Sequence, residues 1–508
     1  MSLEKRALAG ALAGSINVIL TLGQAVLLVP ILLHWWGKEQ YGVWLAVFAA
    51  YGILTAFDGG HQNFLGNEFN RLHVLDLRVS RRALDSALLI GVLLGGFELL
   101  LTIVLVSSGL AEKVLGLGSG PWISQARLAL ILLMVAWMLS GSIGGILVRI
   151  YTPKGLYARA QWLGIAGRLL QLLVTVVVAI SGGGIAAVGA GVATVSLVFS
   201  TFVYYDVYKS APEYWPWLQR PSLREGAARL GKSTILVGTA ILQQFSVNGL
   251  TVMVSSILSA AALPGFVTSR TIANMLMQVS SVVVQPLYPD LVKCRVEGHP
   301  DRLRALLLGI WFITGFLVNI LIVGSFPFLR PLYLWWTGHF LTFDTGLVSC
   351  LLISAALKCY GLPFFSCLAA LNNLRGQITC AAVQMGVTLI LALILLAPLG
   401  SFGLGLSIIA GELAGGVLLP IWFARIELDK TGGGIPLQHF AWHALFTGLS
   451  IAAILAMLFL ERYLWIILGA SLATLLILAY RRVRTLPTEV RTRLEKYMAL
   501  FKRQTSPT

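Results

Sequence analysis

Residues 8–30, LAGALAGSINVILTLGQAVLLVP, form a stretch of 23 residues without a charged side chain. About 20 apolar residues in a helix cross the hydrocarbon core of a bilayer. Lipid offers no hydrogen-bonding partner to a peptide group, so only helices or a closed barrel can span it. The apolar residues are continuous rather than alternating, and the stretch is too long for the core of a signal peptide. It therefore predicts a first transmembrane helix.

The whole chain has the same character. Of its 508 residues 57% are hydrophobic and only 11% are charged, and the mean hydropathy is +0.84; a soluble domain carries roughly 25% charged residues. This composition predicts an all-α polytopic membrane protein. We expect about fourteen transmembrane helices, at approximately 10–33, 41–60, 83–108, 126–150, 160–181, 183–206, 233–259, 264–288, 305–327, 346–371, 376–397, 401–425, 441–460 and 463–480.

The net charge of +16 follows from membrane topology. If the N-terminus is cytoplasmic, the inside segments hold 29 Lys and Arg residues and the outside loops hold five. This asymmetry predicts that both termini are cytoplasmic. Cationic loops beside an anionic leaflet explain the basic composition, so no nucleic-acid partner is expected. The longest inside loops, 61–82 and 207–232, mix basic with apolar residues, and we expect them to lie on the membrane surface.

A weak internal repeat divides the chain. RRALDSALLIG at 81–91 matches RLRALLLGIW at 302–311, and two further pairs recur at offsets of 221 to 223 residues. Six helices fall within one period, so the two copies should be pseudo-symmetric lobes related by an axis along the membrane normal. We expect an N-lobe of helices 1–6 at 1–215, a C-lobe of helices 7–12 at 216–430, helices 13–14 at 431–480, and a basic amphipathic cytoplasmic tail at 481–508.

Common catalytic and metal-binding motifs are absent from the sequence. The five cysteines form no CxxC pair and predict buried apolar side chains. His439 and His443 have the four-residue spacing of a metal pair, but alone they are weak evidence for one. No GxxxxGK[ST] motif occurs, so the chain is not expected to hydrolyse ATP. The sequence thus predicts neither a cofactor nor a metal site.

Charges within the predicted helices are the strongest functional signal. Each deep charge costs about 2.5 to 3.5 kcal/mol on insertion scales, and a partner, a wet cavity or a ligand must offset this cost. Three cations and two carboxylates lie deep, so inward-facing side chains would leave an excess of positive charge that suits an anion. These residues are Arg168, Arg270, Lys358, Glu98 and Glu412.

We predict a phosphate-binding cavity from these cations and their neighbours, because a planar guanidinium binds phosphate oxygens in a bidentate way. The predicted anion-binding residues are Arg270, Arg168, Lys358, Arg149, Asn274 and Gln278. The predicted coupling or gating residues are Glu98, Glu412 and Asp58. Structural roles stay open: Glu98 could pair with a basic residue of its own lobe, Glu412 with Lys358, and Asp58 could cap a helix.

Two segments resemble a known family. WWGKEQYGVWLAVFAAYGILTAFDGG, at 35–60, looks like the helix 1 to helix 2 region of polysaccharide-exporting flippases of the multidrug, oligosaccharidyl-lipid and polysaccharide (MOP) superfamily. GFVTSRTIANMLMQVSSVVVQPLYPDL, at 265–291, is similar to helix 8 of that family, with a proline near the cytoplasmic end. The resemblance covers essentially the whole chain, although its motifs are short.

The resemblance implies translocation of a polyprenyl-pyrophosphate-linked oligosaccharide, such as an O-antigen or exopolysaccharide unit for lipopolysaccharide assembly, to the outer leaflet of the plasma (inner) membrane. It also implies a proton or sodium ion as coupling ion and a polysaccharide polymerase as a further partner. Helix 1 offers only Asn17 and Gln24, whereas drug antiporters of this superfamily use a carboxylate near the start of the first lobe, and peptidoglycan-precursor flippases have an arginine in helix 1. A drug or cation antiporter remains the alternative. An enzyme, such as a membrane glycan ligase or polymerase, is disfavoured by the short outer loops.

Overall fold

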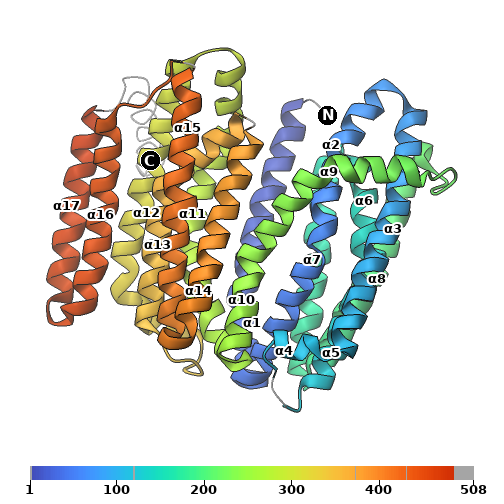
Figure 1. The fold of residues 1–508 in the computed structure, drawn as a ribbon, viewed down its shortest axis with the longest axis horizontal. Coiled ribbons are helices and arrows are strands. Elements are labelled where there is room, and N and C mark those ends of the chain that lie inside the picture. The colour runs from blue at the N-terminus through green and yellow to red at the C-terminus, as the bar shows by residue number, and fades with distance from the viewer. Residues whose placement is uncertain (1–2, 118–119, 372, 431, 486–508) are drawn as a thin grey trace, which may run out of the picture. The chain divides into compact units, whose positions relative to one another are not determined.

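The computed structural model describes residues 3–117, 120–371, 373–430 and 432–485, and every regular element in these residues is helical (Figure 1). Contacts divide the chain into two compact units. The first comprises residues 1–267 and 335–342, and the second comprises 268–334 and 343–508. The predicted all-α membrane fold with about fourteen helices is confirmed. The predicted tail lies largely outside the described residues.

The helices of the first unit are α1 (Leu3–Leu54), α2 (Ala56–Leu75), α3 (Leu77–Ser107), α4 (Leu110–Val114), α5 (Ile123–Ala136), α6 (Gly144–Val148), α7 (Tyr157–Ile180), α8 (Ile185–Ser210), α9 (Leu223–Gln244) and α10 (Leu250–Ile257). A π-helix, Trp137–Ile143, joins α5 to α6, and a second, Phe245–Gly249, joins α9 to α10.

Most residues of α11 (Leu263–Val296) belong to the second unit. The other helices there are α12 (Pro300–Trp336), α13 (Thr345–Ala370), α14 (Leu374–Gly411), α15 (Leu419–Lys430), α16 (Leu437–Phe459) and α17 (Leu464–Thr485). A π-helix, Glu412–Leu418, joins α14 to α15. The contacts place α9 and α10 in the first unit. The lobe boundary predicted between residues 215 and 216 stays a prediction.

Breaks within the longest helices separate neighbouring spans. In α1 the helix is interrupted at Gly37, whose φ of 70° favours glycine, and α14 is interrupted in the same way at Gly400, with φ 58°. Among the described residues, eleven segments are long and apolar enough to cross a membrane, and two of these contain the breaks at Gly37 and Gly400. The extended Ser259, between α10 and α11, lies 222 residues after Gly37, in agreement with the repeat offset.

The prediction that residues 61–82 form a surface loop was wrong. The chain there is helical through α2 to Leu75, and α3 begins at Leu77. Leu65, Phe69 and Leu72 recur at helical spacing and are buried in one apolar cluster with Tyr151. Because this apolar face packs against the core, the polar and basic residues between its members do not break the helix.

α9 packs along α2 at very short range. A β-carbon built on Gly60 would lie 2.3 Å from the backbone Cα of Val237, so only glycine permits this approach. One residue further on, His61 Nδ1 lies 3.0 Å from Ser233 Oγ, and both side chains are buried. The backbone contact and the polar contact together fix the register between the two helices.

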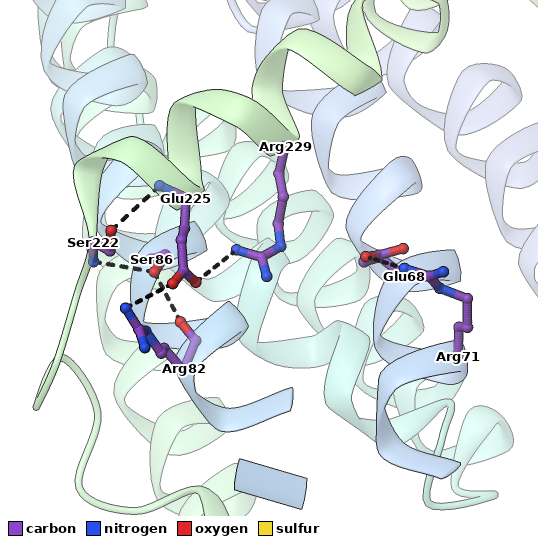
Figure 2. A network of polar contacts seen from close by, with 7 residues as sticks. All are labelled: Glu68, Arg71, Arg82, Ser86, Ser222, Glu225 and Arg229. Carbon is purple, nitrogen blue, oxygen red and sulfur yellow. Dashed lines mark hydrogen bonds and ion pairs between the residues drawn. The ribbon is translucent and has the colours of Figure 1, made fainter. Parts of the chain in front are cut away.

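The start of α9 is held on α3 by a polar network (Figure 2). Glu225 accepts from Arg82 at 2.8 Å and pairs with Arg229 at 3.4 Å. Ser222 caps α9 by accepting from the backbone N–H of Glu225, while its own N–H donates to Ser86 Oγ at 3.1 Å. Because Ser222 and Glu225, at the start of α9, both bond to residues of α3, the N-terminus of α9 has a defined position.

The connection between α8 and α9, residues 211–222, is bound to the same end of the bundle. The buried Asp85 carboxylate accepts from the backbone N–H groups of Leu218 and Arg220, at 2.9 and 3.1 Å.

Glu213, in the same connection, forms an ion pair with Lys154 at 2.6 Å. Burial alone would raise the pKa of Glu213, but the hydrogen bond from Lys154 and the nearby positive charges outweigh it, so this pKa lies below its usual value. The carboxylate therefore stays charged at neutral pH and keeps its ion pair.

The second unit has its own apolar core. Trp311 of α12 is fully buried among Phe364, Phe440 and His443, and the His443 ring is stacked on the indole with centroids 4.0 Å apart. α16 and α17 run antiparallel side by side beside α12 (Figure 1). This aromatic contact ties the C-terminal helix pair to the rest of the unit.

Gly60→Ala should destabilise the first unit, because its methyl group would overlap the α9 backbone, and overpacking of this kind costs about 1 to 3 kcal/mol. We expect a lower midpoint in thermal unfolding of the purified protein in detergent. The neighbouring Gly59→Ala is the matched control, since a β-carbon there meets nothing within 4 Å. Equal midpoints for the two variants would contradict the close packing of α2 on α9.

A cationic cavity in the first unit as candidate functional site

A cavity of about 570 Å³ lies among the helices of the first unit. Its walls come from the second half of α1, from α2, from the segment running from α5 to α6, and from α7 and α8. Two of its lining residues are charged, Arg149 and Arg168, and the described lining includes neither Asp nor Glu. The cavity therefore has a net positive lining.

Arg149 lies at the end of the fourth span, in the 3₁₀ turn Arg149–Tyr151. Its Nη2 donates to Asn63 Oδ1 at 2.9 Å, and its aliphatic stem passes over Gly66, where a β-carbon would lie 3.2 Å from Arg149 Cδ. Asn63 is neutral, and among the described residues no carboxylate lies within 4 Å of this guanidinium. The positive charge of Arg149 is thus solvated but not neutralised.

Arg168 has the same kind of environment. It projects from α7, and its Nη1 donates to Asn17 Oδ1 at 2.8 Å and to Thr21 Oγ1 at 3.1 Å, both on α1. In the described part of the chain it makes no ion pair. A guanidinium held by neutral acceptors keeps further N–H groups for an anion.

The rest of the lining is polar and aromatic. Gln161 and Gln171 lie on α7 with Arg168, at helical spacing of seven and three residues, and Gln171 donates to Ser196 Oγ at 3.0 Å. Tyr51 and Trp137 line the wall with their rings edge to face, 5.9 Å apart. Amides and hydroxyls suit sugar hydroxyl groups, and aromatic faces suit the apolar faces of sugar rings.

A π-helix forms one wall of the cavity. Such segments interrupt regular i→i−4 bonding and often occur at functional sites. Two hydrogen bonds connect this wall to other helices: Gln62 Nε2 of α2 donates to the carbonyl of Gly141 at 3.0 Å, and Ser142 Oγ of the π-helix donates to the carbonyl of Gly91 in α3 at 2.7 Å. A β-carbon on Gly145 would lie 2.3 Å from Gln62 Oε1, so the glycine leaves room for that amide.

Two predicted coupling residues, Asp58 and Glu98, lie behind the aromatic wall. Asp58 is 1% exposed, and its Oδ2 accepts from Trp137 Nε1 at 3.0 Å. Glu98 of α3 is fully buried, and among the described residues neither of its oxygens has a partner at hydrogen-bonding distance. The structural role considered for Glu98, an ion pair with a basic residue of its own lobe, does not occur in the described residues.

The remaining predicted residues belong to the second unit. Arg270, Asn274 and Gln278 follow one face of α11 at fourfold spacing, and Asn274 is exposed. Lys358 on α13 is exposed as well, and Glu412, 4% exposed, accepts from Gln384 Nε2 at 2.6 Å. No Glu412–Lys358 ion pair within 4 Å is found in the described part of this unit. Participation of the first four residues in the anion site, and the coupling role of Glu412, stay predictions.

Sequence reasoning missed Gln62, Trp137, Gln161 and Gln171 as lining residues. The spacing of Gln161 and Gln171 from Arg168 could have predicted that they line the same cavity, because all three share one face of α7. Gln62 and Trp137 gave no such signal, since their position depends on the packing of α2 against the π-helix.

Comparison with known proteins places this geometry in a fold. No protein-family model and no curated protein matches the chain. Among solved structures, "Lipid II flippase MurJ, inward closed conformation" superposes with a TM-score of 0.65 at 16% identity, over 94% of this chain and 98% of that one. An inward-facing multidrug resistance MATE family transporter of the MOP superfamily gives a TM-score of 0.60 at 13% identity, over 80% of this chain and 98% of that one. The chain has the MurJ and MATE transporter fold.

An outward-facing MATE structure matches less well, with a TM-score of 0.53 at 15% identity over 84% of this chain and 94% of that one. The expected fold class, an all-α polytopic membrane protein with a MATE-like fold, is thereby confirmed, and the chain is a multi-pass membrane protein. At 13–16% identity the likeness establishes the fold and leaves the cargo open.

The positive charge of the cavity lining can be tested directly. Ser140→Cys places a thiol in the lining, and the five native cysteines are buried. We expect an anionic methanethiosulfonate to modify this thiol faster, relative to its rate with free cysteine, than a cationic one, because the cavity attracts anions. The preference should fall in Arg168→Gln.

Ser142→Cys is the matched control, because Ser142 is 0% exposed on the same π-helix and should resist both reagents. Equal relative rates for the two reagents at position 140 would contradict a positive lining.

Proposed function

We propose that the chain is a flippase, not an enzyme, which moves a polyprenyl-pyrophosphate-linked oligosaccharide to the outer leaflet by alternating access. The observation that carries this proposal is the cavity containing Arg149 and Arg168, whose described lining includes no carboxylate. A pyrophosphate leaving water loses its hydration, and only charge-assisted hydrogen bonds replace it at comparable strength. The fold shared with a lipid II flippase supports a lipid-linked cargo.

The cavity also suits the saccharide part of this cargo. Its amide and hydroxyl groups, such as those of Gln161, Gln171 and Ser196, can exchange water for sugar hydroxyls. Trp137 and Tyr51 offer aromatic faces. The lipid chain would remain in the bilayer while the head group crosses. An O-antigen or exopolysaccharide unit, with a polymerase acting after it, is the cargo we infer from the resemblance of the two sequence segments.

Orientation follows from the charge asymmetry of the loops. We infer a location in the plasma (inner) membrane with both termini cytoplasmic, so that the chain receives its cargo where lipid-linked saccharides are assembled. With this orientation, the polar network around Glu225 and the 211–222 connection lies at the cytoplasmic end of the first unit. The direction of transport is then outward.

The drug or cation antiporter remains the alternative, because MATE transporters share the fold. The cavity electrostatics argue against it, since a cationic drug would meet two guanidinium groups and no opposing carboxylate in the described lining. Efflux of a cationic dye by wild-type protein, without movement of a lipid-linked saccharide, would favour the antiporter and overturn the flippase.

Arg149→Ala and Arg168→Ala should each reduce flipping by roughly tenfold or more, because each removes a charge-assisted contact of about 1.5 to 3 kcal/mol. The measurement uses proteoliposomes and a fluorescent short-chain polyprenyl-pyrophosphate disaccharide whose outer-leaflet fraction is bleached by an impermeant reductant. Arg168→Lys should retain part of the rate, since it keeps the charge but loses the planar fork.

Arg127→Ala is the control for these substitutions, because Arg127 pairs with Glu112, is 44% exposed and does not line the cavity. Its flipping rate should match that of the wild type. Wild-type rates in Arg149→Ala and Arg168→Ala would remove the basis for the pyrophosphate site.

Arg270→Glu tests the second unit. We expect loss of polymer export in cells while membrane insertion is retained, since reversal of a charge on α11 would repel a phosphorylated cargo. The measurement pairs surface polysaccharide analysis with quantification of the protein in membranes. Normal polymer levels with normal protein levels would exclude Arg270 from the anion site.

A further inference from the structure

Two buried carboxyl groups adjoin the cavity without forming part of its lining. Asp58 on α2 and Glu98 on α3 are 1% and 0% exposed and interact electrostatically. Glu98 follows Gly91 and Gly95 on the face of α3 that packs on the π-helix, where β-carbons on those glycines would meet Ser142 and Met138. The pair thus lies between α2, α3 and the wall of the cavity.

The groups around the pair do not neutralise two negative charges. Tyr51 of α1 and Trp137 and Ser142 of the π-helix face it, and none of them is a cation. His61, one turn along α2, is engaged by Ser233, and neither Asp58 nor Glu98 has an ion-pair partner in the described residues. Two neighbouring carboxylates in a low-dielectric interior cannot both be ionised at low cost, so the pair retains a proton.

The hydrogen bonds assign the proton to one member. Asp58 Oδ2 accepts the Trp137 indole N–H at 3.0 Å, a contact that favours a charged acceptor. Glu98 has no such donor, since both of its oxygens lack a hydrogen-bond partner among the described residues. The charged form is therefore stabilised on Asp58, and the neutral acid is expected on Glu98.

The same contact argues for a proton over a metal cation. A sodium ion needs several oxygen ligands, and an N–H donor directed at the carboxylate competes with it. A proton needs only the oxygens of the pair.

We propose that Asp58 and Glu98 form a proton-binding site that controls anion binding in the cavity. Trp137 connects the two, because its indole bonds to Asp58 while its ring lines the cavity. Loss of the proton adds a negative charge behind the wall and opposes the field of Arg149 and Arg168. This inference rests on the proposed function for its anion, while the proton site itself can be tested without any cargo.

Infrared spectroscopy of the purified full-length protein in detergent tests the proton directly. The carbonyl stretch of a buried carboxylic acid should appear at neutral pH in the wild type and be missing in Glu98→Gln. Glu412→Gln is the matched control, because Glu412 is also buried but bonds to Gln384 in the second unit. It should keep the Glu98 band.

Two infrared outcomes would overturn the proposal. An unchanged band in Glu98→Gln would place the proton elsewhere. A Glu98 band that responds to sodium chloride, with choline chloride as control, and not to pH would make the site a sodium site.

Titration calorimetry with inorganic pyrophosphate tests the connection to the cavity. Raising the pH should weaken binding to wild type by about tenfold more than binding to Glu98→Gln, which mimics the singly protonated pair at every pH. Pyrophosphate itself changes its protonation with pH, but this change is the same for both proteins and therefore cancels in the comparison. Equal pH dependence in both proteins would overturn the connection.

The two measurements separate this inference from the proposed function. If wild type binds no pyrophosphate at any pH, the flippase proposal and the connection to the cavity both fail, while the infrared result still decides the proton site. The unfolding midpoints of Glu98→Gln and Glu412→Gln should stay near that of the wild type, because each substitution replaces a carboxyl group by an amide of equal shape.

Discussion

The candidate site depends on the cost of holding a positive charge within a membrane-spanning helix bundle. Elsewhere in the first unit a carboxylate meets that cost: the Arg229 side chain is only 15% exposed and pairs with Glu225 at 3.4 Å. At the cavity it does not, since Arg149 and Arg168 bond to neutral asparagine and threonine side chains. The contrast supports the proposed anion site.

The cavity exists because small residues line a distorted helix. Gly141, Gly144 and Gly145 follow one another through the π-helix and α6, and Gly164 and Gly167 face the cavity from α7. Small side chains leave volume that larger ones would fill. The irregular hydrogen bonding of the π-helix is compensated from neighbouring helices by Gln62, and α3 is tied to the same segment through Ser142. Polar side chains at the wall thus serve both stability and recognition.

Most of the fold could be predicted from hydropathy, because a membrane requires long apolar helices whatever their tertiary contacts. The prediction failed at 61–82, where the apolar face of Leu65, Phe69 and Leu72 is diluted by polar residues and only packing reveals the helix. Arg149 and Arg168 could be selected as cations within or at the end of predicted spans, but their partners could not. Asn17 lies 151 residues from Arg168, and no local pattern encodes that contact.

The positive cavity and the carboxyl pair together bear on the energy source. A membrane potential, negative inside, favours outward movement of an anion by about 2.3 kcal/mol per charge per 100 mV. A pyrophosphate-linked cargo would therefore be driven outward by the potential alone, without hydrolysis of ATP. A proton leaving Glu98 with the cargo would cancel one of those charges and reduce this driving force, whereas a proton retained through the cycle would not. Under the proposed function, the fate of this one proton would set how much of the membrane potential the transport cycle can use.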